Sequence, residues 1–183
     1  MRVIAGSLKG RRLKSPTWEG LRPTSDKLRE TLFNVVGSRV VGARVIDGYA
    51  GTGAIGIEAI SRGAVHVTFV EADRRAQALI DVNLKACGIE TGYTMLRSTV
   101  ERAWSTLVAD PAFRPFTLIL LDPPYDQPAG EILAGADRLL APEGWVVLEH
   151  ARRMAAPDHA GRLDRARDLR SGDSALAIYA CPH

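Results

Sequence analysis

No stretch of this 183-residue chain is apolar over the roughly 20 residues that a membrane-spanning helix needs. The opening residues, Met1 to Gly6, also lack the apolar segment of a secretory signal peptide. The sequence therefore predicts a soluble, cytoplasmic protein that has no membrane partner.

Cysteine is scarce, since Cys87 and Cys181 are the two thiols of the chain. Their spacing matches no metal-binding pattern and builds no disulfide framework, so we expect no metal site and a reducing compartment. Repeats and low-complexity tracts are also absent from the sequence. Because 46% of the residues are hydrophobic, the chain can bury a core, and its length predicts one domain over 1–183.

The charge is modest in sum but uneven along the chain. The total is +3, yet residues 1–40 hold nine basic and three acidic side chains, which gives +6 there and leaves −3 for the rest. A basic end on a near-neutral body predicts a surface that binds a polyanion such as RNA. The alternative is a solvated face without a ligand. The basic residues that we assign to RNA phosphates are Lys9, Arg11, Arg12, Arg22 and Arg29.

Apolar periodicity predicts alternating strands and helices after residue 40. Strands are expected over 43–47, 65–71, 94–97, 118–121 and 145–149. Helices are expected from 24 or 25 to 36 and over 54–62, 74–86, 99–108 and 129–140. This order predicts an α/β fold with a mostly parallel, doubly wound sheet. Segments 163–167 and 175–180 predict an antiparallel hairpin at the C-terminal edge, and 1–22 a short basic N-terminal arm on an α/β body over 23–183.

The tetrapeptide Asp122-Pro123-Pro124-Tyr125 follows the apolar run 116–121. Prolines stop strand pairing, so a carboxylate, a bent backbone and an aromatic ring meet where open α/β sheets place their chemistry. An aspartate and a proline carbonyl can accept hydrogen bonds from an exocyclic NH2 group, and a tyrosine can stack on a flat base. The pattern favours a site for the amino group of adenine, cytosine, guanine or an amide. A plain strand-to-loop turn is the alternative.

A glycine-rich loop follows the first strand of the alternating region. Gly51, Gly53 and Gly56 match the dinucleotide pattern G-x-G-x-x-G, and Glu71 follows at the distance that suits a ribose. The loop suits either the pyrophosphate of a nicotinamide cofactor or the amino-acid part of S-adenosylmethionine. Asp47 favours the second, because a carboxylate repels pyrophosphate and can face a cationic amino group. The tetrapeptide likewise has no role in hydride transfer.

Several blocks together resemble one known family, the bacterial 16S ribosomal RNA (guanine-N2-)methyltransferases of the RsmD type. The matching blocks cover nearly the whole chain and are 2–6, 22–34, 47–53, 56–64, 69–71 and 122–125. The chain departs from the usual family residues at Gly48, Tyr49, Thr52 and Ser171, where Leu, Phe, Ser and Tyr are common. Gly48 is expected to loosen the loop.

The resemblance implies a Rossmann-like class I methyltransferase fold with S-adenosylmethionine as the methyl donor. It implies that the acceptor is a guanine of 16S rRNA, in an assembled or assembling small ribosomal subunit, and we expect a monomeric enzyme. Carried over by position, the methionine part meets Asp47, Gly51 and Gly53, and the ribose meets Glu71. The guanine is implied to lie against Asp122, Pro123, Pro124 and Tyr125.

Three other functions compete with this one. An N6-adenine DNA methyltransferase shares the tetrapeptide, but such enzymes usually carry a target-recognition insertion of domain size, for which this chain has no spare segment. An inactive RNA-binding module would not need the acceptor motif and Glu71 together. A nicotinamide oxidoreductase would have no use for the acceptor motif.

Overall fold

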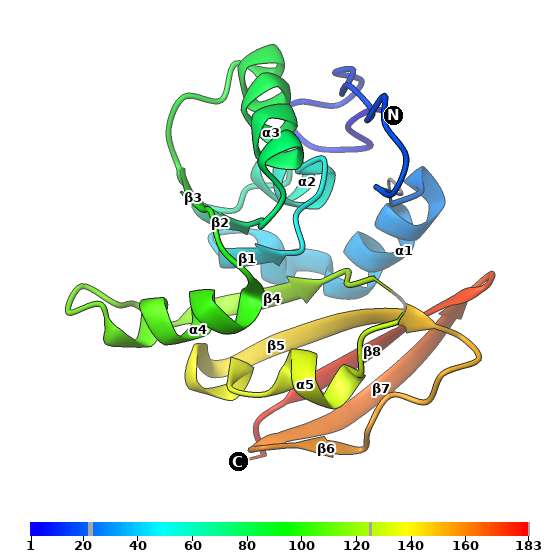
Figure 1. Cartoon of the computed structure of the whole chain (residues 1–183), viewed down its shortest axis with the longest axis vertical. Helices are drawn as coiled ribbons and strands as arrows, with labels where there is room; N and C mark the ends of the chain where they lie inside the picture. Colours follow the sequence, from blue (N-terminus) through cyan, green and yellow to red (C-terminus); the bar gives the residue numbers. More distant parts are fainter. Residues whose placement is uncertain (22–23, 125, 183) are drawn as a thin grey trace.

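The computed structural model describes residues 1–21, 24–124 and 126–182, and these residues build one twisted mixed sheet with helices on both faces (Figure 1). Within the described residues the sheet has eight strands in the order β3-β2-β1-β4-β5-β8-β7-β6. The first five are parallel, and β8, β7 and β6 add antiparallel pairing at one edge. This arrangement is the predicted doubly wound sheet with its C-terminal edge hairpin.

The strands and helices follow the predicted alternation closely. The strands are β1 (Arg44–Gly48), β2 (His66–Val70), β3 (Tyr93–Leu96), β4 (Phe116–Leu121), β5 (Leu140–Ala151), β6 (His159–Ala160), β7 (Leu163–Ser171) and β8 (Ser174–Ala180). The helices are α1 (Asp26–Val36), α2 (Ala54–Ser61), α3 (Arg74–Cys87), α4 (Val100–Ala109) and α5 (Ala129–Leu133), with 3-10 turns η1 (Gly37–Val40) and η2 (Ala136–Arg138).

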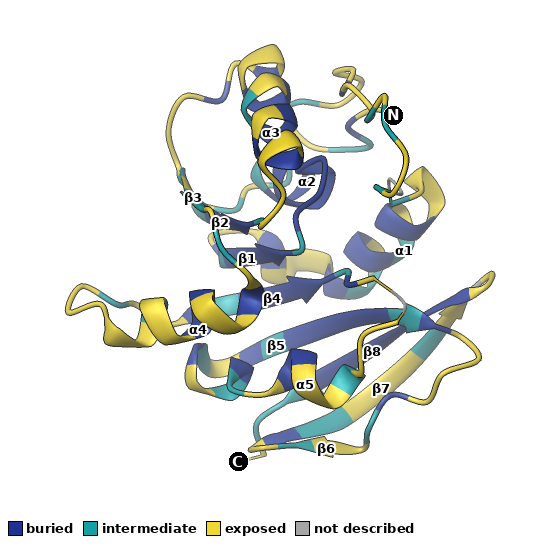
Figure 2. Cartoon of the chain, in the orientation of Figure 1, coloured by how far each residue is buried: buried dark blue, intermediate teal, exposed yellow. Residues whose placement is uncertain are grey.

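Alternation along each strand supplies the two halves of the core. In β4, Leu118 and Leu120 pack with α1, α2 and α3, whereas Ile119 and Leu121 pack with α4 and α5 on the other face. All four side chains are buried, as expected for strands covered on both sides. Figure 2 shows the central strands and α2 in the buried colour, whereas α1 and α3 carry both buried and exposed residues.

The N-terminal arm packs on the body. The arm folds back on itself, so that Arg2 and Arg12 form an isolated antiparallel β-bridge. Val3 and Leu13 are buried in the same core cluster as residues of α1 and α2. On α2, Glu58 accepts hydrogen bonds from the backbone N–H groups of Ile4 and Ala5 at 2.7 and 2.9 Å. The N-terminal arm therefore folds back on itself, and it is anchored to the α/β body by apolar burial and by a carboxylate.

The predicted helix over 129–140 is wrong in its length. Helix α5 ends at Leu133, because Gly135 adopts a left-handed conformation with a φ of 84°. The chain then makes the turn η2 and enters β5 at Leu140, five residues before the predicted start of that strand. Buried residues at Ile132 and Ala136 give a helical spacing in the sequence, but two short turns satisfy the same spacing. Among the described helices, none has both the length and the apolar character to cross a membrane.

Candidate active site

The carboxyl ends of β1, β2, β4 and β5 meet at one edge of the sheet, where doubly wound folds bind their ligands. Parallel pairing aligns Gly48 with Val70 on one side and with Leu121 on the other. Leu121 in turn aligns with Leu148 of β5. The residues that follow these four positions therefore surround one cleft, although they are far apart in the sequence.

The buried side chain of Asp47 supports the glycine loop through a hydrogen bond. Its Oδ2 accepts a hydrogen bond from the Gly56 N–H at 2.8 Å, and the side chain is buried. Burial raises the pKa of this carboxyl, and the negative charges of Asp122 and Glu71 raise it further against the opposing hydrogen bond from Gly56. Asp47 does not line the cleft. The structure thus places it as a support for the loop, one layer below the predicted ligand contact.

Glycine is required at two positions in this loop. Gly53 begins α2 with a φ of 75°, a left-handed conformation that strains other residues. A Cβ on Gly56 would lie 2.2 Å from Cε1 of Phe69, so only glycine lets α2 pack this closely on β2. The loop consequently turns sharply and brings the first turn of α2 against the cleft.

Glu71 comes directly after β2 and faces the loop. Its Oε2 accepts a hydrogen bond from the Gly51 N–H at 2.8 Å, and its Oε1 accepts one from the Asp73 N–H at 2.8 Å. Glu71 and Gly51 both line the cleft. Two of the residues predicted to bind the cofactor, Glu71 and Gly51, therefore lie beside each other in the cleft.

Asp122 also lines the cleft, directly after β4, which lies two strands away from β2 in the sheet, and we call this part of the cleft the acceptor end. Thr24 donates a hydrogen bond from its hydroxyl to Oδ2 of Asp122. Glu149, which follows Leu148 in β5, forms a hydrogen bond with Asp122 and raises its pKa, although burial is the larger cause. Glu149 is itself buried and accepts a hydrogen bond from the Ser174 hydroxyl at 2.9 Å. The carboxyl groups of Asp122 and Glu149 therefore lie next to each other at the acceptor end.

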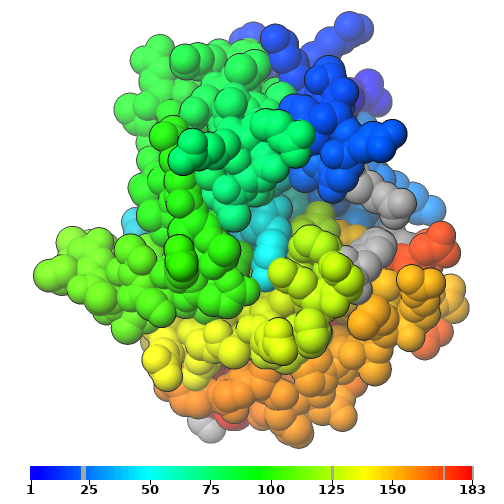
Figure 3. All heavy atoms as spheres, viewed as in Figure 1, coloured from blue at the N-terminus to red at the C-terminus, as the bar shows by residue number. Residues whose placement is uncertain are grey.

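The cleft has a volume of about 760 Å³, within the range of small-molecule sites. Figure 3 shows the cyan atoms of the glycine-loop region set back between the green atoms of α3 and β3, the yellow-green atoms near α5 and the blue N-terminal segment. Among its described lining residues, Arg75 is the one basic side chain. The acidic side chains that line it are Glu19, Glu71, Asp73, Asp122, Glu149 and Asp173.

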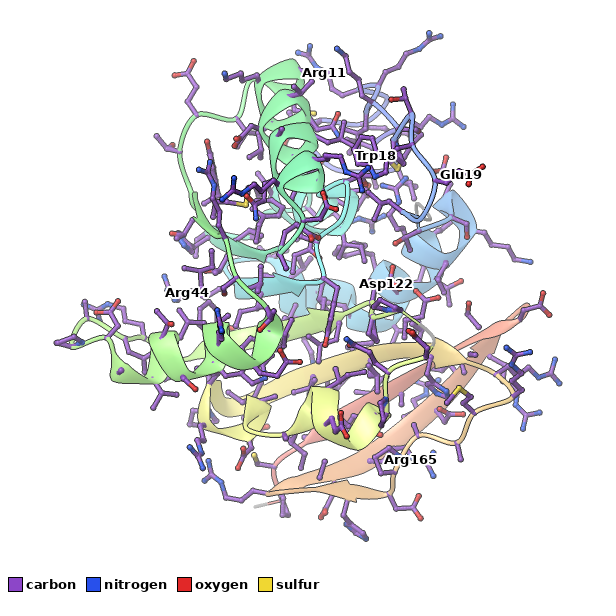
Figure 4. The ribbon with its side chains drawn as sticks, in the orientation of Figure 1. Arg11, Trp18, Glu19, Arg44, Asp122 and Arg165 are labelled. Carbon is purple, nitrogen blue, oxygen red and sulfur yellow. The ribbon has the colours of Figure 1, made fainter. Side chains whose placement is uncertain are left out.

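The segment that links the arm to α1 covers part of this cleft. Trp18, Glu19, Gly20 and Leu21 all line it. The guanidinium of Arg75 lies over the Trp18 ring, 5.2 Å from its centroid. Figure 4 shows Trp18 on the α3 side and Asp122 at the end of β4. The cleft is therefore bounded by an N-terminal segment as well as by the sheet.

Comparison with known proteins gives the family. A family model described as "Conserved hypothetical protein 95" matches residues 1–180. The chain belongs to this family. Its relatives include "Putative rRNA methyltransferase YlbH" of Bacillus subtilis, which is 38% identical over 183 residues and 98% of each chain. "Ribosomal RNA small subunit methyltransferase D" of Escherichia coli K12 is 36% identical over 149 residues, which are 81% of this chain and 71% of that one.

A solved structure agrees with this assignment. "Putative methyltransferase yhhF from Escherichia coli" superposes with a TM-score of 0.81 and 31% identity, over 99% of this chain and 97% of that chain. The predicted RsmD-type family and the class I methyltransferase fold are both confirmed.

In this family member the predicted RNA-binding residues divide into three groups. Lys9, Arg11 and Arg12 are exposed on the arm. Arg22 lies outside the described residues, as does Tyr125 of the predicted acceptor motif. The prediction that Arg29 binds RNA phosphates is wrong, because its side chain is completely buried.

Arg29 instead joins the arm, α1 and α2. Its Nη2 donates hydrogen bonds to the Arg2 carbonyl at 2.8 Å and to Oδ1 of Asp26 at 2.6 Å. Its Nη1 lies 3.6 Å from Oε2 of Glu58. A guanidinium placed in this way stabilises the packing of the three elements and is inaccessible to a phosphate.

Thr24, Glu149 and Ser174 line the acceptor end of the cleft, and sequence reasoning did not assign them to it. Thr24 was one of two residues predicted as the start of the first helix, but Ser25 caps α1 by accepting a hydrogen bond from the Leu28 N–H. Glu149 ended a predicted parallel strand, so its place at the same sheet edge as Asp122 could have been inferred from the strand order.

Proposed function

We propose that this protein transfers a methyl group from S-adenosylmethionine to the exocyclic N2 of a specific guanine in small-subunit ribosomal RNA. Methylation of ribosomal RNA by a class I enzyme follows from the family. The guanine, its N2 atom and the residue roles are our proposal. The observation that carries it is that Glu71, directly after β2, and Asp122, Pro123 and Pro124, directly after β4, line one and the same cleft.

The described residues fit the cofactor. S-adenosylmethionine carries a cationic sulfonium and an amino group, and when bound it supplies an electrophilic methyl group. Six carboxylates against one arginine favour such a cation and disfavour a pyrophosphate. We assign the ribose hydroxyls to Glu71 and the methionine part to the loop at Gly51 and Gly53, which Asp47 supports.

At the acceptor end, Asp122 and the Pro123 carbonyl would accept the two hydrogens of the guanine amino group. The N2 lone pair is delocalised into the ring, so these hydrogen bonds would turn N2 toward tetrahedral geometry and aim it at the methyl carbon. Orientation of this kind supplies several kcal/mol of barrier reduction. Asp122 would also stabilise the positive charge that develops on N2. The new N–C bond forms as the S–C bond breaks, and N2 then loses a proton.

The decisive experiment maps modified nucleosides in 16S rRNA from a strain that lacks the gene. We expect one N2-methylguanosine to disappear and to return when the wild-type gene is restored. Asp122→Ala should not restore it, while its affinity for S-adenosylhomocysteine stays near that of wild type. Asp110→Ala, which removes an exposed carboxylate beyond α4, is the matched control. Loss of N6-methyladenosine instead would favour the adenine alternative.

We further propose that the RNA is methylated within an assembled or assembling subunit, by a monomeric enzyme in the cytoplasm. The exposed basic residues of the arm offer a small surface for phosphates, and the cleft itself is acidic. A surface of this kind gives little selectivity among naked RNA sequences. Comparison of naked 16S rRNA with reconstituted subunits as substrates tests this part separately.

A further inference from the structure

The acceptor end of the cleft holds a carboxyl pair of which the proposed mechanism uses one member. Strands β4 and β5 are parallel and pair Leu121 with Leu148, so Asp122 and Glu149 extend from adjacent strands at the same level. Both line the cleft, and Glu149 is only 6% exposed. A buried glutamate at this position is costly unless it has a partner or a ligand.

The surroundings of the pair fix its charge. Thr24 and Ser174 donate hydrogen bonds to Asp122 and Glu149, one to each. Among the described residues, two further acidic groups lie near it, namely Asp47 beneath the glycine loop and Asp173 in the turn between β7 and β8. The hydrogen bond between Asp122 and Glu149 needs one proton shared by the two carboxyl groups, because two carboxylates offer no donor. The raised pKa of Asp122 agrees with this.

We propose that Glu149 selects guanine by accepting a hydrogen bond from N1–H, while Asp122 accepts one from the neighbouring N2 amino group. The inference rests on the proposed function and adds a specificity residue to it. Guanine presents two donors side by side on its Watson–Crick edge, and two carboxylates side by side match them. As the base enters, its two N–H groups replace the shared proton, which leaves to solvent.

The same pair rejects other bases that carry an amino group. Adenine and cytosine present a lone pair beside their amino group, and this lone pair would face Glu149. An ionised carboxylate repels a lone pair, and a buried polar group left without its partner costs the full desolvation penalty. The acceptor motif alone holds any planar amino group, so Glu149 supplies the discrimination that the motif lacks.

The test changes both sides of the contact. Target RNA is prepared with guanine or with 2-aminopurine at the mapped nucleotide; 2-aminopurine keeps the 2-amino group, lacks O6 and has a lone pair at N1, and the comparison with Glu149→Gln separates the effect of N1 from that of O6. For wild type we expect kcat/KM to be roughly 100-fold lower with 2-aminopurine, because the site's buried acceptor is left unpaired. For Glu149→Gln, whose amide can donate to that lone pair, we expect the two substrates to differ by less than about 10-fold.

The outcomes separate the two claims. An unchanged preference in Glu149→Gln, or equal rates for the two bases with wild type, overturns the role of Glu149 while the proposed function stands. A wild-type enzyme that methylates no guanine of the subunit overturns both. Calorimetry with S-adenosylhomocysteine and thermal unfolding establish that the variant is folded. Glu143→Gln, an exposed position in the same strand, is the matched control and should keep the wild-type preference.

A second measurement uses the wild-type protein alone. Binding of the guanine RNA should release more protons than binding of the 2-aminopurine RNA, because only guanine replaces the shared proton with two donors. Titration calorimetry in two buffers of different ionisation enthalpy counts these protons. Equal counts for the two RNAs would contradict the proposal even if the variant failed to fold.

Discussion

Glu71 has two contacts that bear on the cofactor, one with the glycine loop and one with the interior of the cleft. It accepts hydrogen bonds from the N–H groups of Gly51 and Asp73, and it lines the cleft where the ribose is proposed to bind. The same carboxylate therefore orders the glycine loop and is placed to meet the cofactor. Its removal would leave the Gly51 N–H without this acceptor as well as two ribose hydroxyls.

Replacing Glu71 with alanine should weaken the binding of S-adenosylhomocysteine by about 1–3 kcal/mol, the usual cost of unpaired polar groups. Titration calorimetry measures the change directly. Glu90→Ala removes a carboxylate that is exposed beyond α3 and should leave the affinity unchanged. Equal affinity in Glu71→Ala and wild type would remove Glu71 from the cofactor site.

At the scale of secondary structure, the contact between α2 and β2 sets the position of the glycine loop. Gly56→Ala would place a methyl group 2.2 Å from Cε1 of Phe69, so α2 has to move outward. We expect a loss of about 1–3 kcal/mol in the free energy of unfolding, as for other overpacked cores, with weaker cofactor binding.

Chemical denaturation with and without S-adenosylhomocysteine measures both effects of Gly56→Ala. Gly130→Ala is the control, because a Cβ there meets nothing within 4 Å on the short helix α5. It should be neutral or slightly stabilising, since alanine is the better helix former. If both variants behave alike, close packing at Gly56 does not limit stability.

The arm offers a second prediction at this scale. Lys9, Arg11 and Arg12 are exposed, whereas the apolar residues of the arm are buried in the core. Replacing the three basic residues with alanine should lower RNA affinity and flatten its dependence on salt, because fewer counterions are released. Cofactor binding should persist, since the anchoring residues are unchanged.

Binding to RNA or subunits across a salt series tests the arm. The matched control removes three exposed arginines outside the arm, Arg102 in α4, Arg114 in the loop after α4 and Arg138 in η2, and should keep the wild-type slope. Identical slopes for the arm variant and wild type would mean that the arm is only a solvated surface. The docking surface would then have to lie elsewhere, for example at the arginines of 162–170.

The sequence predicted helices α1 and α3 well, because the residues that end a helix are its neighbours in the chain. Ser25 and Gly37 cap the two ends of α1, and Asp73 and Gly88 cap the two ends of α3, as capping chemistry requires. The prediction of one helix over 129–140 failed because the spacing of its apolar residues does not distinguish one long helix from two short turns. The prediction that Arg29 binds RNA failed for another reason. Its partner Glu58 lies on α2, and no local pattern in the sequence reveals a buried ion pair between distant segments.

The candidate site was predicted in the same uneven way. Asp122 and Glu71 follow apolar strands, so the edge of the sheet and hence the cleft could be inferred from the sequence. The support given by Asp47 could not, because its burial depends on how closely α2 approaches β2. Nor could the contact of Thr24 with Asp122, which joins a loop before α1 to the end of β4.

At the scale of the whole molecule, the net charge is unevenly distributed. Residues 1–40 carry +6 and the remainder −3. Figure 4 shows Arg11 at the arm, well away from Asp122 at the end of β4. Phosphates are therefore attracted to the exposed arm, while the cleft attracts a cation. Such a division lets one small protein bind a polyanion and a cationic cofactor without competition between them.

This division predicts which cofactor stabilises the fold. A ligand at 100 times its Kd adds about 2.7 kcal/mol, which raises the Tm of a protein of this size by roughly 5–10 °C. We expect that rise with S-adenosylmethionine, whose cationic sulfonium, amino group and ribose fit the cleft. NAD should give none, because its pyrophosphate would meet carboxylates at both ends. Thermal unfolding with each ligand, for wild type and Glu71→Ala, measures the difference. A rise with NAD that Glu71→Ala abolishes would make the cleft a dinucleotide site, and the attraction of acidic side chains for a cation would not be what selects its ligand.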